Sequence, residues 1–411
     1  MMLATLTNKL RWSYRKNAPD IFAILMRNYP RFVTEKEPKE LFDEIPVFTF
    51  HTVAPASFEE KLKFLAHNGY QTLSGQEFSA AMSGEIAIPP HSVLLTFDDG
   101  RASLYSVAFP LLQKYGFRAV AFIIPGLIPE TAQLSQTYVD FFAGHASAED
   151  LLAREQSEEP LCSWEEIKTM HESGVIDFQS HTLYHHQVCV SEELVDFLHP
   201  RYPAYFFGNI NVPAFRHRGE WRFERRLAWG MPVYRAEPRM AGLPAFFDDE
   251  RVRQACIDFV RGEGGKHFFS SAGWRKRLLS VYHAQCKRFN KTGMEAPADQ
   301  HQDILEDLAF SKRMIEEKLP GQRVEQLCYP WFMGCPLVVR LSKETGYAVN
   351  YWGIVPNRPT NRRGQSLFYV PRVEDHYLLR LPGEGRRDLY DILKTKFKTN
   401  LPGFTSQMMK N

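Results

Sequence analysis

The sequence predicts an α/β fold with a mostly parallel sheet and one long insertion. Segments of strand length alternate with helical patterns over residues 44–179, and the same alternation returns over residues 302–373. Strands joined by helices of this length pair in parallel, because the helix carries the chain back to the edge where the strand began. Residues 188–297 are rich in aromatic and arginine side chains and lack this alternation. We therefore expect an α/β body with an insertion that forms a cap or side lobe.

The first half of the body is expected to hold three strands and two helices. In the helical pattern over residues 57–70, apolar side chains recur at helical spacing until Gly69 stops them. A second helix is expected over residues 103–116, where Pro110 should introduce a kink because proline removes a backbone donor. The strands are expected over residues 44–50, 92–97 and 118–124.

The second half repeats the pattern on both sides of the insertion. A helix over residues 163–174 is expected to begin at Ser163, since Glu166 three residues later completes a capping box. A strand over residues 175–179 follows it. After the insertion we expect helices over 302–319 and 336–346, strands over 324–330, 347–352 and 367–373, and a basic helix over 383–403.

These patterns divide the chain into four parts. They are an N-terminal helical extension over residues 1–43, a discontinuous α/β body over 44–187 and 298–381, the insertion over 188–297, and a basic tail helix over 382–411. The segment over residues 12–29 has an apolar cluster flanked by basic side chains. It could pack on the body as an ordinary amphipathic helix or lie on a membrane surface.

Composition narrows the function classes. The 411 residues carry a net charge of only +2, which argues against a nucleic-acid-binding surface spread over the chain. The six cysteines form no closely spaced pair, so we expect free thiols rather than a disulfide framework or a thiolate zinc site. No signal peptide or membrane-spanning run is recognised. We therefore expect a cytoplasmic protein, with the inner face of the membrane as the alternative location.

Polar side chains follow two of the expected strands at the point where each strand ends. Asp98 and Asp99 follow the strand over residues 92–97, and His181 and His185 follow the strand over residues 175–179. Carboxyl ends of parallel strands are where α/β barrels assemble reactive groups. Histidines four residues apart share a face if the loop makes a helical turn, which suits two ligands of one divalent ion.

The spacing leaves alternatives open. His186 could replace His185 as a ligand. Residues 98–100 could form only a turn that caps the next helix, and the histidines could be ordinary surface residues. If Asp99 joins two histidines, the site has open positions for water and substrate, as catalytic metal sites do.

Taken together, the motifs resemble those of the polysaccharide deacetylases, a family of carbohydrate esterases that share the nodulation-factor deacetylase domain. "TFDDG" at 96–100 and "HTLYH" at 181–185 resemble the first two family motifs. Residues 46–78 resemble the opening strand and helix, "CYPWFMG" at 328–334 resembles the third motif, and "FYVPRV" at 368–373 resembles a late strand. The resemblance covers residues 44–187 and 303–380 and leaves the insertion unmatched.

The resemblance implies an irregular (β/α)7 barrel of the TIM-like kind. It also implies a metal-dependent hydrolase that removes an N-acetyl or other N-acyl group from an amino sugar of a bacterial surface polysaccharide or lipid-linked glycan precursor. Asp98 would be the general base, while Asp99, His181 and His185 would hold the divalent ion, most often Zn²⁺. The chemistry agrees with the residue types, since an ion activates water and polarises the amide while a carboxylate accepts the proton.

The chain departs from the family pattern at two roles. Family members supply a late histidine as the acid for the leaving nitrogen, and His376 is the only late candidate here. The third motif usually carries an arginine that fixes the base, but this chain has none there, so Arg372 is a candidate replacement. His51, at the end of the first strand, is either a supporting residue of the site or a core histidine.

The third motif also offers aromatic side chains for a sugar pocket. Tyr329 and Trp331, with Pro330 between them, could form its walls because aromatic faces stack on pyranose rings. Packing inside the barrel is the equally weighted alternative. In the insertion, the arginines over residues 215–226 could bind a phosphate-bearing substrate or form a solvated face with ion pairs.

Three functions remain open from the sequence. The first is the N-deacetylase, the second a deformylase of lipid-linked amino sugars or an amidase of cyclic ureides, and the third a catalytically inactive glycan-binding barrel. The expected partners are an amino-sugar glycan or a lipid-linked sugar, with peripheral membrane contact as an option and no nucleic acid.

Overall fold

The structure is a computed structural model of the whole chain, and it describes residues 20–38, 41–131, 134–157, 159–202, 213–217, 220–222, 228–289 and 291–399. The chain forms two compact units. The first comprises Met1–His181, Ser311–Phe332 and Gly346–Asn411, and the second comprises Thr182–Phe310 and Met333–Thr345. The four-part division expected from the sequence stays a prediction.

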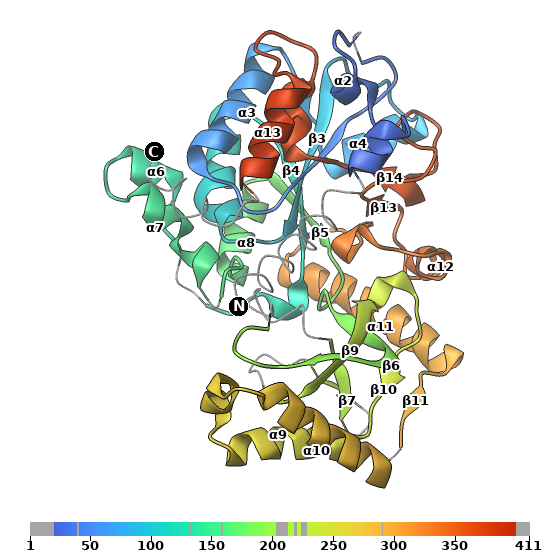
Figure 1. Cartoon of the computed structure of the whole chain (residues 1–411). Coiled ribbons are helices and arrows are strands. Elements are labelled where there is room, and N and C mark those ends of the chain that lie inside the picture. Colours follow the sequence, from blue (N-terminus) through green and yellow to red (C-terminus); the bar gives the residue numbers. More distant parts are fainter. Residues whose placement is uncertain are drawn as a thin grey trace. The chain divides into compact units, whose positions relative to one another are not determined.

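The first unit is built on one parallel sheet (Figure 1). Its hydrogen-bonded order is β14-β13-β12-β5-β4-β3-β1-β15, and β2 adds to β3 outside this path. All of these pairs are parallel. The strands are β1 Val47–Phe50, β2 Gln71–Thr72, β3 Ser92–Asp99, β4 Ala119–Ile123, β5 Ile176–Ser180, β12 Gln326–Cys328, β13 Val349–Trp352, β14 Val370–Pro371 and β15 Val373–Glu374.

The two end strands of this sheet, β14 and β15, belong to one short stretch of chain. β14 pairs with β13, β15 pairs with β1, and only Arg372 separates β14 from β15. The ring of neighbouring strands therefore closes around seven positions, and the predicted irregular (β/α)7 barrel is confirmed. The strand expected over residues 367–373 is wrong in its first half, because Leu367–Tyr369 forms a 3-10 turn.

The helices between the strands follow the predicted alternation with local differences. The helix expected over residues 103–116 is split into a π-helical turn and α5, and the break just before Pro110 is the distortion that this proline predicts. The capping box of Ser163 and Glu166 is present at α8. The helical elements are α2 Arg31–Thr34, α3 Pro55–His67, α4 Gly75–Ser83, the π-helix Leu104–Ala108, α5 Phe109–Tyr115, α6 Tyr138–Phe142, α7 Ala148–Leu152, α8 Trp164–Glu172 and α13 Leu389–Thr399.

Helix α4 was not predicted from the sequence, although the sequence contains a capping signal for it. Ser74 caps α4 by accepting from the backbone N–H of Glu77, whose side chain accepts from the backbone N–H of Ser74. This is the same Ser-x-x-Glu signature that predicts α8. The core behind it is apolar and aromatic, with Phe78, Phe122 and Tyr351 fully buried in one cluster.

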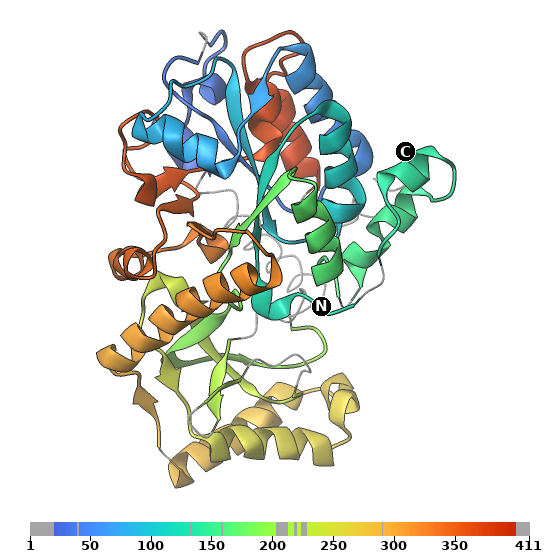
Figure 2. The same cartoon turned by 180° about the vertical axis from the view of Figure 1, so that it is seen from behind.

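The second unit consists of antiparallel strand pairs and helices. β6 pairs with β9, β7 with β8, and β10 with β11. Helices α9 and α10 pack side by side, as Figures 1 and 2 both show. Antiparallel pairs explain why the insertion lacks β-α alternation. The elements are β6 Gln187–Phe197, β7 Phe215–His217, β8 Glu220–Arg222, β9 Pro232–Pro238, β10 Phe246–Phe247, α9 Glu250–Gly262, α10 Trp274–Arg288, β11 Gly293–Met294 and α12 Pro336–Glu344, while α11 Pro297–Lys318 begins in this unit and ends in the first.

The two ends of the described chain meet at one lysine. Residues 20–25 are helical, and Lys396 of α13 donates to Asp20 at 2.8 Å and lies 2.7 Å from Glu374. Much of the segment expected over residues 12–29, and the tail beyond Thr399, lie outside the described residues. Among the described helices, none combines the length and the apolar character needed to span a bilayer. The cytoplasmic location and the membrane-surface contact stay predictions.

Candidate active site

Asp98 lies near the carboxyl end of β3 and is held by the segment that closes the barrel. Its side chain is 2% exposed, and the Arg372 guanidinium, fully buried, donates to both oxygens, from Nη1 to Oδ1 at 2.7 Å and from Nη2 to Oδ2 at 2.8 Å. Arg372 also donates to Thr96 Oγ1 at 3.1 Å. Such a bidentate pair fixes the orientation of the carboxylate as well as its charge.

The electrostatics of this pair favour an ionised base. Burial by itself would raise the pKa of Asp98, but the charges of Arg372 and His181 and the hydrogen bonds from Arg372 outweigh it, so the pKa lies well below its usual value. Burial by itself would lower the pKa of Arg372, but the charge of the Asp98 carboxylate outweighs burial and raises this pKa. Asp98 is therefore a carboxylate at neutral pH.

Cys328, in the third motif, lies against the Asp98–Arg372 pair. Its Sγ lies 2.9 Å from Arg372 Nη2 and 3.8 Å from each carboxylate oxygen of Asp98. Burial raises the pKa of the Cys328 thiol, although the charge of Arg372 acts in the opposite direction. The positive partner of Asp98 thus comes from the last strand segment rather than from β12. Cys328 is the first residue of the third motif, but sequence reasoning gave it no role.

The chain turns sharply at Asp99, the second of the two adjacent carboxylates. Asp99 has φ 72° and Gly100 has φ 75°, both in the left-handed region. A Cβ at Gly100 would lie 2.9 Å from Ile123 Cγ2, so the turn needs glycine for space as well as for conformation. The two adjacent carboxylates can therefore take different partners.

His181 directly follows β5 and faces Asp99. Its Nδ1 lies 2.9 Å from the backbone oxygen of Cys328, which can only accept, so the ring proton resides on Nδ1. Its Nε2 lies 3.5 Å from Asp99 Oδ1. Burial lowers the pKa of His181 despite the nearby Asp98 and Asp99 carboxylates. A neutral imidazole with a fixed tautomer and an outward Nε2 is the form that binds a metal.

Two overlapping groups of described side chains could hold a metal ion. They are Asp98, His181 and Cys328, and Asp99, His181 and His185, and in each group one ligand atom per residue lies within 4.8 Å of the others. In the first group Arg372 already occupies Asp98, and the raised pKa of Cys328 keeps its thiol protonated. The second group, with one carboxylate and two imidazoles, fits a divalent ion such as Zn²⁺ better.

The loop that carries His185 differs from the expected helical turn. Thr182 has φ 67° and His185 has φ 49°, so residues 181–185 are not helical. The backbone N–H of His185 donates to Thr182 Oγ1 at 3.2 Å. His186, the alternative ligand, belongs to neither metal group of the described residues. Its Nδ1 lies 3.9 Å from Asp307, and burial lowers its pKa to about 3.

The two candidate acids differ in their surroundings. His51 follows β1, is 49% exposed, and has its Nε2 3.9 Å from Asp98 Oδ2. His376 follows β15, and its Nδ1 lies 3.1 Å from Asp375 and 3.9 Å from Glu374. His51 therefore adjoins the base, whereas the described ion-pair partners of His376 are carboxylates of its own chain segment.

Glu155 holds together the loops that follow β1 and β3. It accepts from Thr52 Oγ1 at 2.9 Å, from Arg101 Nε at 2.8 Å, and from the backbone N–H of Ser103 at 2.8 Å. Because Thr52 follows His51, Glu155 positions the segment on which His51 lies. Its role depends on contacts about 50 to 100 residues apart in sequence, which no local pattern signals.

The two aromatic residues proposed to line a sugar pocket, Tyr329 and Trp331, differ in exposure. Tyr329 is fully buried, its ring packs edge-on against Trp352 at 4.7 Å, and its hydroxyl accepts from Asn350. Pro330 is also buried. Tyr329 and Pro330 therefore pack inside the barrel, which was the alternative to their lining a sugar pocket. Trp331 is partly exposed and has a left-handed φ of 50°, so it stays a candidate sugar contact.

Comparison with known proteins identifies the domain. Residues 86–199 match the family model described as polysaccharide deacetylase. The YxkH protein of Bacillus subtilis (strain 168) is 32% identical over 120 residues, which cover 27% of this chain and 41% of that protein. The poly-beta-1,6-N-acetyl-D-glucosamine N-deacetylase of Escherichia coli (strain K12) is 28% identical over 144 residues, which cover 35% and 20%. The chain thus spans less than half the length of these relatives.

One solved structure is also similar to this chain. The BpsB deacetylase domain from Bordetella bronchiseptica matches with a TM-score of 0.48 and 15% identity, covering 82% of this chain and 97% of that one. The matched residues 86–199 contain Asp98, Asp99, His181 and His185. Over residues 86–199, this chain is therefore similar to the polysaccharide deacetylase family.

Proposed function

We propose that the protein is a metal-dependent hydrolase that removes the acetyl group from an N-acetylated amino sugar of a bacterial glycan. One observation carries the proposal: the ionised Asp98, clamped by Arg372, lies beside His181, whose Nε2 faces Asp99. A base that cannot rotate and a neutral imidazole ready to bind an ion are the two parts that amide hydrolysis at a metal requires.

Asp99, His181 and His185 would hold the divalent ion, with Zn²⁺ as the favoured metal because imidazole and carboxylate are its common ligands. Such an ion would supply Lewis-acid activation of water and polarise the amide carbonyl. Asp98 accepts the proton from the attacking water, and Arg372 keeps Asp98 ionised and oriented before the reaction. The carbon-nitrogen bond then breaks, and the products are acetate and a free amine.

The departing nitrogen needs a proton, and two histidines are candidates to deliver it. His51 is supported by its Nε2 lying 3.9 Å from Asp98 and by its partial exposure. His376 is supported by the late position that family members use for this residue. The short distance to Asp98 favours His51. The acid must protonate the nitrogen of the same amide bond whose carbon the base-activated water attacks, so base and acid must lie close together.

The substrate proposed is a polymer or lipid-linked glycan that contains N-acetylglucosamine. A relative from Escherichia coli (strain K12) is named for N-deacetylation of poly-beta-1,6-N-acetyl-D-glucosamine. The partly exposed Trp331 supports a pyranose ring near the third motif. We therefore name β-1,6-linked N-acetylglucosamine as the first substrate to test.

The test measures acyl release and metal content on the same protein. Purified chain loaded with Zn²⁺ should release acetate from β-1,6-linked N-acetylglucosamine oligomers, and a chelator should abolish release until metal is restored. N-formyl oligomers tested in parallel separate a deformylase, which would release formate instead. Stoichiometric metal with no acyl release from any of these substrates would contradict the proposed reaction and favour a glycan-binding barrel.

A further inference from the structure

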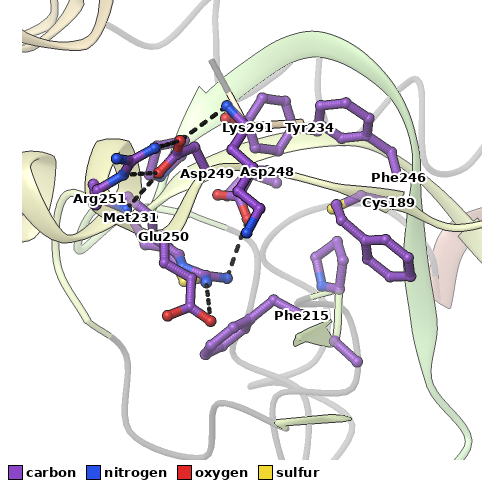
Figure 3. Close-up of a pocket in the computed structure, with 16 residues that line it drawn as sticks. Cys189, Phe215, Met231, Tyr234, Phe246, Asp248, Asp249, Glu250, Arg251 and Lys291 are labelled. Carbon is purple, nitrogen blue, oxygen red and sulfur yellow. Dashed lines mark hydrogen bonds and ion pairs between the residues drawn. The ribbon is translucent and has the colours of Figure 1, made fainter. Parts of the chain in front are cut away.

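The second unit contains a cavity that the deacetylase site does not use. Its volume is about 530 Å³, within the ~300–1,000 Å³ range of small-molecule sites. All sixteen of its lining residues lie between Cys189 and Lys291, so one compact unit builds it. Figure 3 shows Asp249, Glu250 and Arg251 on one side of the space and Cys189 and Phe246 on the other.

One part of the lining is aromatic. Tyr234 and Phe246 pack edge-on at 5.2 Å, and Phe247 follows on the same short strand β10. Phe215 lies under the guanidinium of Arg253, with 4.1 Å from the guanidinium carbon to the ring centre. Such rings offer apolar faces of the size that the C–H face of a pyranose covers.

The other part of the lining is charged but balanced. It has three carboxylates and three cationic side chains, and the two arginines among them contact the carboxylates. Asp249 accepts from the Arg251 side chain and from the backbone N–H of Lys291, while Arg253 lies 3.3 Å from Asp248 and 3.9 Å from Glu250. Since the lining has no net charge, it favours neither a phosphate group nor a cation.

Paired carboxylates and guanidinium groups next to aromatic faces suit one ligand class. Each pair presents acceptors and donors together, which match neighbouring hydroxyl groups of a sugar ring. Burial raises the pKa of Asp248, against the charge of Arg253, so hydrogen bonds from a ligand would relieve its desolvation. A neutral ring with polar edges and an apolar face satisfies both parts of the lining.

We propose that this cavity binds a neutral pyranose unit of the glycan, such as an N-acetylglucosamine residue, as a second glycan site in the chain. The choice of glycan rests on the proposed function. The site itself rests on the aromatic and charge-balanced lining, so it can hold even if the hydrolytic reaction is another one.

The test is calorimetric titration with a β-1,6-linked N-acetylglucosamine pentasaccharide. Asp98→Asn protein is used so that no turnover occurs, and chelator-treated unmodified chain replaces it if that variant does not fold. Phe215→Leu, which removes the aromatic face, should weaken binding about fivefold, the size of one lost aromatic contact. Glu250→Gln, which removes a carboxylate, should weaken binding by about fivefold or more, the size of one lost hydrogen bond to a charged group. Glu192→Gln, an exposed change on β6 outside the lining, should bind like the parent.

Equal affinity of the parent and the two lining variants would overturn the proposal, and so would a parent that does not bind the pentasaccharide. Binding of inorganic phosphate that is lost in Arg251→Gln, without saccharide binding, would overturn it in favour of an anion site. Because the readout is binding by a protein that cannot turn over, failure here is distinct from failure of acetate release.

Discussion

One aspartate in each unit lies beside a buried arginine, and the pKa values of the two aspartates shift in opposite directions. In the barrel, Arg372 donates to both oxygens of Asp98 at 2.7 and 2.8 Å, and the pKa of Asp98 falls well below its usual value. In the second unit, Arg253 approaches one oxygen of Asp248 at 3.3 Å, and burial raises the pKa of Asp248. At Asp98 the charges of Arg372 and His181 and the hydrogen bonds from Arg372 outweigh burial. At Asp248 the charge of Arg253 does not outweigh burial, and the charges of Glu250 and Asp249 add to the rise.

The difference follows from how each arginine is held. Arg372 lies in the stretch that pairs with β13 on one side and β1 on the other, so the closed barrel fixes its backbone. Arg253 lies on α9, where it divides its charge between Asp248 and Glu250 beside a cavity. A guanidinium that is held against both oxygens keeps the carboxylate ionised, as at Asp98. A guanidinium divided between two carboxylates leaves Asp248 able to form further hydrogen bonds with a ligand.

The largest expected effect is at the base. Asp98→Asn should lower kcat by about 10²–10⁴-fold with bound metal retained, because proton acceptance is lost while the proposed ligands remain. It also leaves Arg372 buried without its counter-charge, which costs on the order of 3–5 kcal/mol of unfolding free energy. Acetate release, metal analysis and urea unfolding measure the three effects. A folded Asp98→Asn protein with unchanged kcat would remove Asp98 from the base role.

Loss of a proposed metal ligand should reduce metal and activity together. In Asp99→Ala or His181→Ala, the Zn²⁺ content and acetate release are expected to fall in parallel, by at least about tenfold, since both depend on the same ion. Metal per chain after dialysis is compared with kcat for each variant. His186→Ala is the matched control, because it changes a neighbouring histidine outside both metal groups. Full metal content in His181→Ala would contradict the ligand assignment.

A matched pair of histidine variants identifies the acid. His51→Gln should lower kcat by about 10²-fold, while His376→Gln should change kcat little. The expectation follows from the distance of 3.9 Å between His51 Nε2 and Asp98 Oδ2. The reverse result would assign the acid to His376 and leave His51 a supporting residue.

The contribution of the two hydrogen bonds from Arg372 to Asp98 can be tested by a substitution that keeps the positive charge. Arg372→Lys retains a cation but cannot donate to both oxygens of Asp98, so we expect about 1.5–3 kcal/mol lower unfolding free energy. Urea unfolding of Arg323→Lys, a change on an exposed side chain, gives the baseline for an arginine-to-lysine exchange. Equal stability of the two variants would show that charge alone, without the two hydrogen bonds, holds Asp98.

The smallest effect is expected in the second unit and depends on pH. The folded pKa of Asp248 lies above its ordinary value of 3.8, so the folded state holds this proton longer than the unfolded state. The resulting penalty is absent below the unfolded pKa and complete above the folded pKa. Asp248→Asn should therefore lessen the loss of stability as pH rises from about 4, measured by urea unfolding at several pH values. An unchanged pH slope would contradict the raised pKa.

Local patterns account for much of the fold and part of the site. The alternation of strands and helices, the capping box at Ser163, and the strand ends that carry Asp98 and His181 could be predicted, because each depends on neighbours a few residues away. The helix α4 carried an equally local signal at Ser74. The insertion resisted prediction because antiparallel pairs such as β6 with β9 depend on partners distant in sequence.

By itself, the sequence determined the α/β alternation, the Asp-Asp-Gly turn and the family that its motifs resemble. Only the tertiary structure decided that Arg372 is the partner of Asp98, a contact across 274 residues, and that Cys328 lies against Arg372. It also decided that Tyr329 packs inside the barrel. The physical reason is that closure of the barrel brings together strand ends whose side chains have no fixed spacing along the chain, so no sequence period can report their contact.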